Sequence, residues 1–266
     1  GDLLLGHCLV LSPGADRQPG FGIPTTEPVW SLPGCWVRAD VADQTRLEGF
    51  TVVDVATVIV THLSEVIKSH LHELLPLDEV HTMLEHFAEA YPEVVEAVYT
   101  GLPLHVVQHV LQELLREKIP VRDLLTILET LIENAPLTQD PGLLTAYVRQ
   151  RLARVICHRW QTIEGEIPAL LLSEEAESTL LEALDLPAPR TVLALDPYLT
   201  QCLLQALTQA AEAMAQAQYT PLLITSPLLR AHVKRLAEVA LPQLVVLSRH
   251  ELVASVRIKS LGIVSM

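Results

Sequence analysis

The spacing of hydrophobic residues changes twice along this chain of 266 residues and divides it into three blocks. In the first fifty residues, short apolar runs such as 8–11 and 35–37 are separated by turn-forming residues, which include seven of the 11 glycines. This pattern is typical of short strands and tight turns. From 77 to 160, apolar residues recur every three or four positions, as amphipathic helices require. From 168 onward, strand-like and helix-like segments alternate.

The central block predicts a compact helical domain. Residues 104–117, 121–135 and 142–160 each carry an apolar stripe along one side and polar residues on the other. Prolines recur near the starts of these segments, where the missing N–H of proline costs the helix no hydrogen bond. Several short amphipathic helices joined by brief loops pack into a bundle-like domain.

The last block predicts an α/β domain. Its candidate helices are 197–218 and 226–240, the second capped by Ser226 with Pro227 at its first position. A strand, a helix and a strand within about 30 residues form a βαβ unit with a parallel strand pair. The candidate strands are 169–172, 192–195, 221–225, 244–247 and 256–258. The fold class we expect is therefore α+β with several subdomains: a small β-rich amino-terminal part, a helical centre and a carboxy-terminal α/β part.

Composition argues against nucleic acid as a partner and against metal ions. The chain has 18 basic and 32 acidic residues, a net charge of −14, and only 11 aromatic residues. A nucleic-acid-binding face needs basic charge and stacking surfaces. The four cysteines, at 8, 35, 157 and 202, form no CxxC pair and no zinc spacing.

No window of about 18 apolar residues occurs, so we expect a soluble chain.

No residue pattern points to catalysis, and we predict no catalytic residue, metal or cofactor. The turn around Ser226 lacks the glycine that phosphate binding requires. His105 and His109 have metal-pair spacing, but no glutamate lies between them and they fall on the polar side of their segment. The alternative is a soluble α/β enzyme with a helical insertion and an active site near Ser226 or Asp196, at the carboxyl ends of the parallel strands.

Basic residues gather between 149 and 159 in an otherwise acidic chain. Arg151, Arg154 and His158 share one helical stripe by their spacing. They either complement the dipole at the end of their own helix or contact an acidic face, perhaps of another copy. Candidates for the acidic face are Glu79, Glu85, Glu89, Glu93 and Glu96.

A helix capped by Asp54 is predicted to run to about Leu75. Thr61 lies on its less apolar side and is expected to face outward, towards solvent or a neighbouring element. The core-facing stripe is assigned to Ile59, Leu63, Val66, Ile67 and Leu74. Trp30 and Trp36 stand in the proline-rich block. Each is either the core of a small domain or an anchor for a binding partner.

Several segments in order resemble one family. They are 51–54, 57–65, 110–124, 126–131, 148–149, and 246–248 with Glu251. The sequence is similar to the cytoplasmic domain of the export-gate proteins of flagellar and type III secretion systems, the FHIPEP family, over nearly the whole chain.

The resemblance implies a non-enzymatic docking platform. Members have a membrane part, absent here, and a soluble part at the cytoplasmic face of the bacterial inner membrane that forms a ring of nine copies. The ring docks chaperone–cargo complexes and gatekeeper proteins and works with the secretion ATPase and its stalk. The matching subdomains would be 1–54 (β-rich second), 55–75 (returning helix of a truncated first), 76–163 (helical, ring-building third) and 164–266 (α/β fourth).

The resemblance also implies two sets of site residues. The chaperone-binding depression would include Glu27 and Trp30 of the segment Glu27-Pro28-Val29-Trp30, together with Val53, Val58 and Thr61. Glu27 and Trp30 replace the flagellar aspartate and phenylalanine, which favours an injectisome member. The contact between copies, through the helical subdomain, is predicted to use Arg122, Arg149, Arg151 and Arg154.

Overall fold

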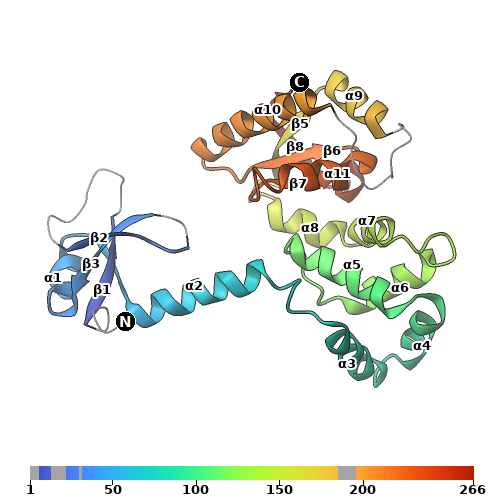
Figure 1. The fold of residues 1–266 in the computed structure, drawn as a ribbon, viewed down its shortest axis with the longest axis horizontal. Coiled ribbons are helices and arrows are strands. Elements are labelled where there is room, and N and C mark those ends of the chain that lie inside the picture. Colours follow the sequence, from blue (N-terminus) through green and yellow to red (C-terminus); the bar gives the residue numbers. More distant parts are fainter. Residues whose placement is uncertain (1–5, 13–21, 30–31, 185–195) are drawn as a thin grey trace. The chain divides into compact units, whose positions relative to one another are not determined.

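The computed structural model describes residues 6–12, 22–29, 32–184 and 196–266. The chain divides into two compact units, Gly1–Leu74 and Leu75–Met266. Each unit is described by itself (Figure 1).

The first unit is a small antiparallel sheet with two helices. The strands lie in the order β2-β3-β1-β4, and every neighbouring pair is antiparallel. One side of the sheet packs on the short helix α1 through Val10, Val37, Ala42 and Phe50. The predicted strands near 8, 35 and 51 are confirmed, whereas β2 and α1 were not predicted. The elements are β1 (His7–Leu11), β2 (Ile23–Thr26), β3 (Pro33–Arg38), a 3-10 turn (Ala39–Val41), α1 (Ala42–Leu47), β4 (Thr51–Asp54) and α2 (Val55–Ser69).

The second unit begins with a helical layer, and the predicted amphipathic stripes form its core. Leu111, Ile127, Leu131 and Leu144 are fully buried in one cluster. The segment 142–160, predicted as one helix, is two helices because Leu152 leaves the helical conformation (φ −83°, ψ 11°). The helices are α3 (Leu77–Ala88), α4 (Pro92–Gly101), α5 (Leu104–Arg116), α6 (Leu124–Asn134), α7 (Pro141–Arg151) and α8 (Ala153–Trp160).

The rest of the second unit is an α/β layer built on a parallel sheet of order β7-β6-β5-β8. The predicted βαβ unit is confirmed as β6, α11 and β7. The predicted strand 192–195 lies outside the described residues, and helix α9 was not predicted. The elements are β5 (Glu166–Leu172), α9 (Glu174–Leu184), α10 (Pro197–Gln216), β6 (Leu222–Thr225), α11 (Pro227–Ala237), β7 (Val245–Ser248), a 3-10 turn (Arg249–Glu251) and β8 (Arg257–Val264).

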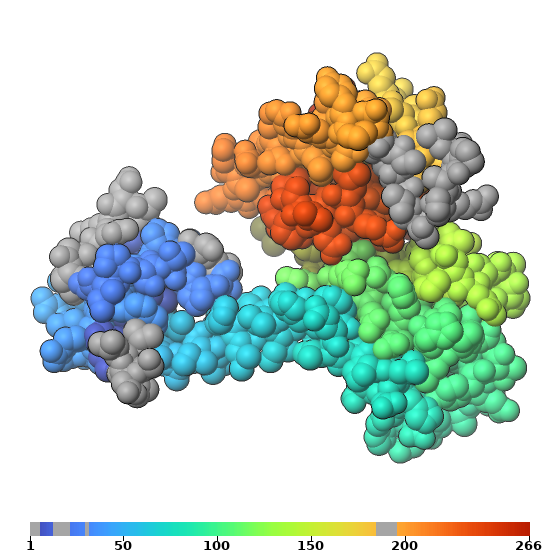
Figure 2. Space-filling model, in the orientation of Figure 1, coloured from blue at the N-terminus to red at the C-terminus, as the bar shows by residue number. Residues whose placement is uncertain are grey.

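The parallel sheet lies between two apolar layers because its residues alternate from one face to the other. Ile224 and Leu247 join the helical-layer core. Leu223 and Val246 pack with α10 and α11 on the opposite face. Figure 2 shows the helical layer in green directly against the orange-to-red α/β layer. No helix in the described ranges combines the length and hydrophobicity needed to cross a bilayer.

Candidate functional site

The structure brings three of the five predicted partner-binding residues together in the first unit. Val53 lies on β4, and Val58 and Thr61 lie on α2, which follows β4 directly and contacts β1 and β4. Val58 is 9% exposed and Thr61 is half-buried, so this side of α2 faces the sheet. Val53 pairs in register with Leu9 of β1, which is fully buried.

The start of α2 is fixed by the predicted cap. The Asp54 carboxylate accepts a hydrogen bond from the backbone N–H of Thr57 at 2.9 Å and from its hydroxyl at 2.7 Å. These bonds stabilise the ionised form and lower the pKa of Asp54. Because the cap sets where the helix begins, it also sets the positions of Val58 and Thr61.

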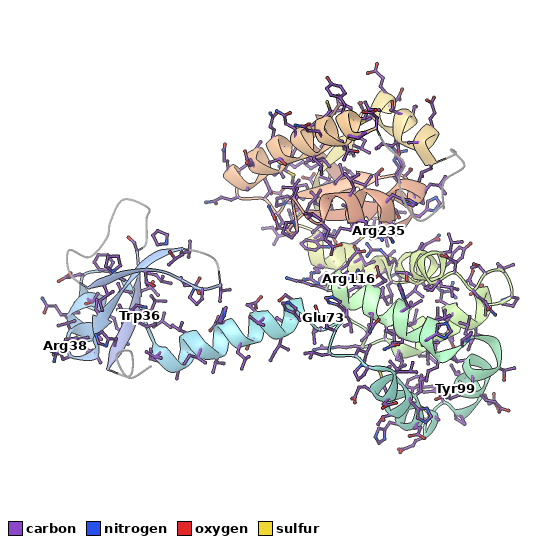
Figure 3. The ribbon with its side chains drawn as sticks, in the orientation of Figure 1. Trp36, Arg38, Glu73, Tyr99, Arg116 and Arg235 are labelled. Carbon is purple, nitrogen blue, oxygen red and sulfur yellow. The ribbon has the colours of Figure 1, made fainter. Side chains whose placement is uncertain are left out.

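Glu27 lies at the other edge of the same sheet. It follows β2, three strands away from β4, which is roughly 14 Å at the usual strand spacing. It is 4% exposed, and its carboxylate accepts the N–H of Val29 at 3.0 Å. Glu27 therefore shapes the turn after β2. Trp30 lies outside the described residues, and Trp36, labelled in Figure 3, is half-buried on β3.

The predicted core stripe of α2 is wrong. Ile59 is 59% exposed and Leu63 is 54% exposed, while the sheet covers the side that carries Val58. The prediction assumed that the most apolar side of a helix is covered within its own unit. In this structure, no described residue of the first unit covers the most apolar side of α2. The other exposed members of this apolar face are Val60, Val66 and Ile67. The helix ends at Ser69, so the prediction that it runs to about Leu75 is wrong, and the exposed Leu71 and Leu74 lie in the turn beyond it.

The predicted arginine group divides into surface and core. Arg122, Arg151 and Arg154 are exposed, and Arg151 forms only a long ion pair with Glu133, at 3.7 Å. The prediction that Arg149 serves the contact between copies is wrong, because its side chain is 1% exposed. Its guanidinium donates to Glu251 at 2.7 and 2.9 Å and to Glu117 at 2.9 Å.

This buried network joins the two layers of the second unit. Glu117 ends α5, Arg149 lies on α7, and Glu251 follows β7. Arg230 of α11 also pairs with Glu117. Burial raises the pKa of Glu117, but the attraction of the two arginines outweighs it and holds that pKa below its ordinary value. No spacing in the sequence could reveal this network, since Arg149 and Glu251 are 102 residues apart.

Near Ser226 and Asp196, where the alternative enzyme site was predicted, the polar groups hold the starts of two helices. Asp196 caps α10 by accepting the N–H of Tyr198 at 2.7 Å. The N–H of Ser226 donates to Glu177, whose carboxylate is also held by Arg249 at 2.7 Å. The start of α11 therefore already carries an anion of the chain itself. Across the described ranges, no three His, Cys, Asp or Glu residues are grouped to hold a metal ion.

One surface feature includes Glu93 and Glu96, two of the residues that the sequence offered as an acidic face. A shallow, open hollow lies between α4 and the end of α6. Its lining includes the acidic residues Glu93 and Glu96 and the apolar residues Ala97, Ile132 and Pro136. It depends on two helices that are distant in sequence, so periodicity alone could not locate it.

Comparisons with known proteins agree on one family. A sequence model of the FHIPEP family matches residues 1–257. The flagellar biosynthesis protein FlhA of Bacillus subtilis is 38% identical over 268 residues, which is 100% of this chain and 39% of that protein. The chain thus spans about two-fifths of the length of this relative.

Solved structures share the fold. The Chlamydia pneumoniae CdsV protein has a TM-score of 0.85 and 28% identity, over 97% of this chain and 75% of that chain. CdsV has also been solved in complex with CdsO. The nonameric EPEC SctV-C has a TM-score of 0.76 and 23% identity, over 98% of this chain and 78% of that chain, which shows a common fold.

Proposed function

Because the chain belongs to the FHIPEP family, we propose that it is part of a protein-export gate and works as a ring-forming docking platform. The family match over residues 1–257 is the observation that carries this proposal. The longer protein would be anchored in the bacterial inner membrane, with this part at the cytoplasmic face. It would act by binding other proteins and would form or break no covalent bonds.

The proposed subdomains are those that the family resemblance implies. Residues 1–54 would be the β-rich second subdomain, and 55–75 would be the returning helix of the first. The exposed apolar face of α2 supports that assignment, because such a large apolar surface is normally covered. Residues 76–163 are the helical, ring-building third subdomain, and 164–266 are the α/β fourth.

Self-association is the first proposed activity. The nonameric state of SctV-C supports a ring of nine copies. A closed ring repeats one contact between two different surfaces. The proposed basic side of that contact consists of the exposed residues Arg122, Arg151 and Arg154 of the helical layer. Arg149 is no longer included, because it is buried.

Docking of chaperone–cargo complexes and of a gatekeeper is the second proposed activity. Val53, Val58 and Thr61 lie together where β4 leads into α2, and Trp30 is the proposed anchor. Glu27 would act by shaping the turn that leads to Trp30. The complex of CdsV with CdsO supports a further partner, which we propose to be a stalk component of the secretion ATPase.

The branch of the family remains a prediction. The motif around Glu27 and Trp30 favours an injectisome, whereas the 38% identity to a flagellar protein favours the flagellar branch. Binding assays with one flagellar and one injectisome chaperone separate the two.

Calorimetric titration with the cognate chaperone–cargo complex tests the docking proposal. Trp30→Ala should weaken binding roughly tenfold or more, as loss of an aromatic anchor does. The matched control is Leu47→Ala, since Leu47 is 89% exposed on α1 of the same unit. Equal affinity of the wild type and the Trp30 variant, with both folded, would remove Trp30 from the binding site.

A further inference from the structure

The outer edge of strand β8 is open. β8 is the last strand of the parallel sheet β7-β6-β5-β8, and no strand in the described ranges pairs with its far side. It is eight residues long and begins with four exposed residues, at 257–260. The opposite edge strand, β7, has four residues, three of them buried. An open edge strand presents backbone N–H and C=O groups to which an extended chain can add.

Two residues near the start of β8 turn these backbone groups outward. The N–H of Arg257 donates to the carbonyl oxygen of Gly165, just before β5, at 3.3 Å. Because the backbone groups of successive strand residues alternate between the two edges, Lys259 also faces β5, whereas Ile258 and Ser260 face outward. The register shifts after Ser260, so the regular stretch open to a new strand is 257–260.

The side chains of this stretch alternate between basic and apolar. Arg257 and Lys259 lie on one face of the strand and Ile258 on the other. The side chain of Arg257 is 73% exposed and meets Glu166 only at 3.5 Å. The Lys259 ammonium lies 5.7 Å from the centre of the Tyr219 ring and pairs with no carboxylate of the described residues. In a chain with a net charge of −14, this edge is therefore locally basic.

The charges decide which kind of strand can add to this edge. A second copy of β8 would bring Arg257 and Lys259 of one chain close to the same residues of the other. Like charges across a strand pair destabilise it, and basic residues on an edge are a common means of preventing self-pairing. An acidic strand meets no such repulsion and gains opposite-charge pairs across the strands.

We propose that the outer edge of β8 binds an extended acidic segment of another protein as a fifth strand of the sheet. The backbone groups of Ile258 and Ser260 supply the hydrogen bonds. Acidic residues at alternate positions of the segment lie beside Arg257 and Lys259, and the apolar residue between them lies beside Ile258. The sequence pattern that fits is acidic–apolar–acidic, in either strand direction. This inference goes beyond the proposed ring and the proposed docking depression and depends on neither.

A peptide titration followed by fluorescence anisotropy tests the inference. The probe is a short fluorescein-labelled peptide that alternates glutamate and valine. The control peptide has the same composition but carries its glutamates together at one end, so it cannot match the alternation of the edge. The alternating peptide should bind at least about tenfold more tightly than the control peptide, because only it pairs both bases and Ile258 at once.

Charge reversal on β8 gives the matched variants. R257E/K259E should bind the alternating glutamate peptide about tenfold or more weakly, and should instead bind a peptide that alternates lysine and valine. R38E/R46E makes the same charge change at exposed positions of the first unit and should bind as the wild type does. Equal losses in the two variants would overturn the inference, since net charge and not the edge would then govern binding.

Hydrogen exchange measured by NMR separates strand addition from simple charge attraction. Saturating peptide should slow exchange of the Ile258 and Ser260 N–H groups by about tenfold or more, because they gain hydrogen bonds. The Lys259 N–H, which faces β5 in the free protein, should change little. Binding without this protection would overturn the inference, as would absence of binding. Dimers of the free protein joined through β8 would also overturn it, since a second copy would then occupy the edge.

Discussion

At the scale of single residues, Arg149 shows most clearly where sequence reasoning ends. Its position among other basic residues indicated a surface arginine, and its spacing placed it on a helix, which is correct. The side chain of Arg149 points into the core because it pairs with Glu117 and Glu251. The fold brings these two residues to it from the end of α5 and from the turn after β7. A buried arginine is tolerated only with such partners.

Removing the Arg149 side chain should strongly destabilise the second unit. Arg149→Ala leaves the buried carboxylate of Glu251 without its ion-pair partner and Glu117 with Arg230 alone. Breaking a comparable buried pair costs about 3–5 kcal/mol. Urea unfolding followed by the fluorescence of Trp160, in a W30F/W36F background, measures the change in the free energy of unfolding. Arg151→Ala, at a 59% exposed side chain, should change it by at most about 0.5 kcal/mol. Equal small effects of both substitutions would contradict the network.

The Glu117 carboxyl group predicts a pH dependence of stability. Burial raises its pKa, but the attraction of Arg149 and Arg230 lowers it by a larger amount. The pKa of Glu117 in the folded state therefore lies below the ordinary value of 4.5. Such a group stabilises the fold above the unfolded pKa, and this contribution is lost as the pH falls through the folded pKa.

Glu117→Gln should therefore be less stable than wild type near neutral pH, and the difference should shrink as the pH falls below 4.5. Urea unfolding at a series of pH values measures it. Glu129→Gln, at an exposed position of α6, is the matched control and should track the wild type. A difference for Glu117→Gln that stays constant at low pH would contradict the assignment.

At the scale of elements, the sequence predicts existence and type better than orientation. The cap at Asp54, the stripes of α5 and α6, and the unit of β6, α11 and β7 follow from local residues and were predicted correctly. The buried side of α2 was predicted wrongly, because which side is buried depends on the elements that pack against the helix. The same holds for the partner-binding residues: neighbours in sequence, such as Val53 and Val58, come together, whereas Glu27 lies across the sheet.

Two substitutions on α2 should separate its two sides. Val58→Ala removes two buried methyl groups and should cost about 1.5 kcal/mol in this chain. Leu63→Gln, on the exposed apolar face, should change stability here by at most about 0.5 kcal/mol. In a longer protein that contains the rest of the first subdomain, Leu63→Gln should become destabilising. Chemical unfolding of both proteins measures this, and an unchanged effect of Leu63→Gln in the longer one would contradict the proposal that this face is covered.

At the scale of the whole molecule, the helical layer and the α/β layer of the second unit belong to one compact body. The Arg149 network and the shared core around Ile224 bind the helical layer to the α/β layer. We propose that copies of this unit assemble into a ring, and a membrane-anchored protein would gain effective concentration for doing so.

Imaging of the assembled protein by electron microscopy tests the central claim most directly. The account predicts closed rings in which each copy contacts the next through the helical layer. Monomers alone at concentrations where the membrane-anchored protein is functional, or symmetric dimers joined through identical surfaces, would contradict it.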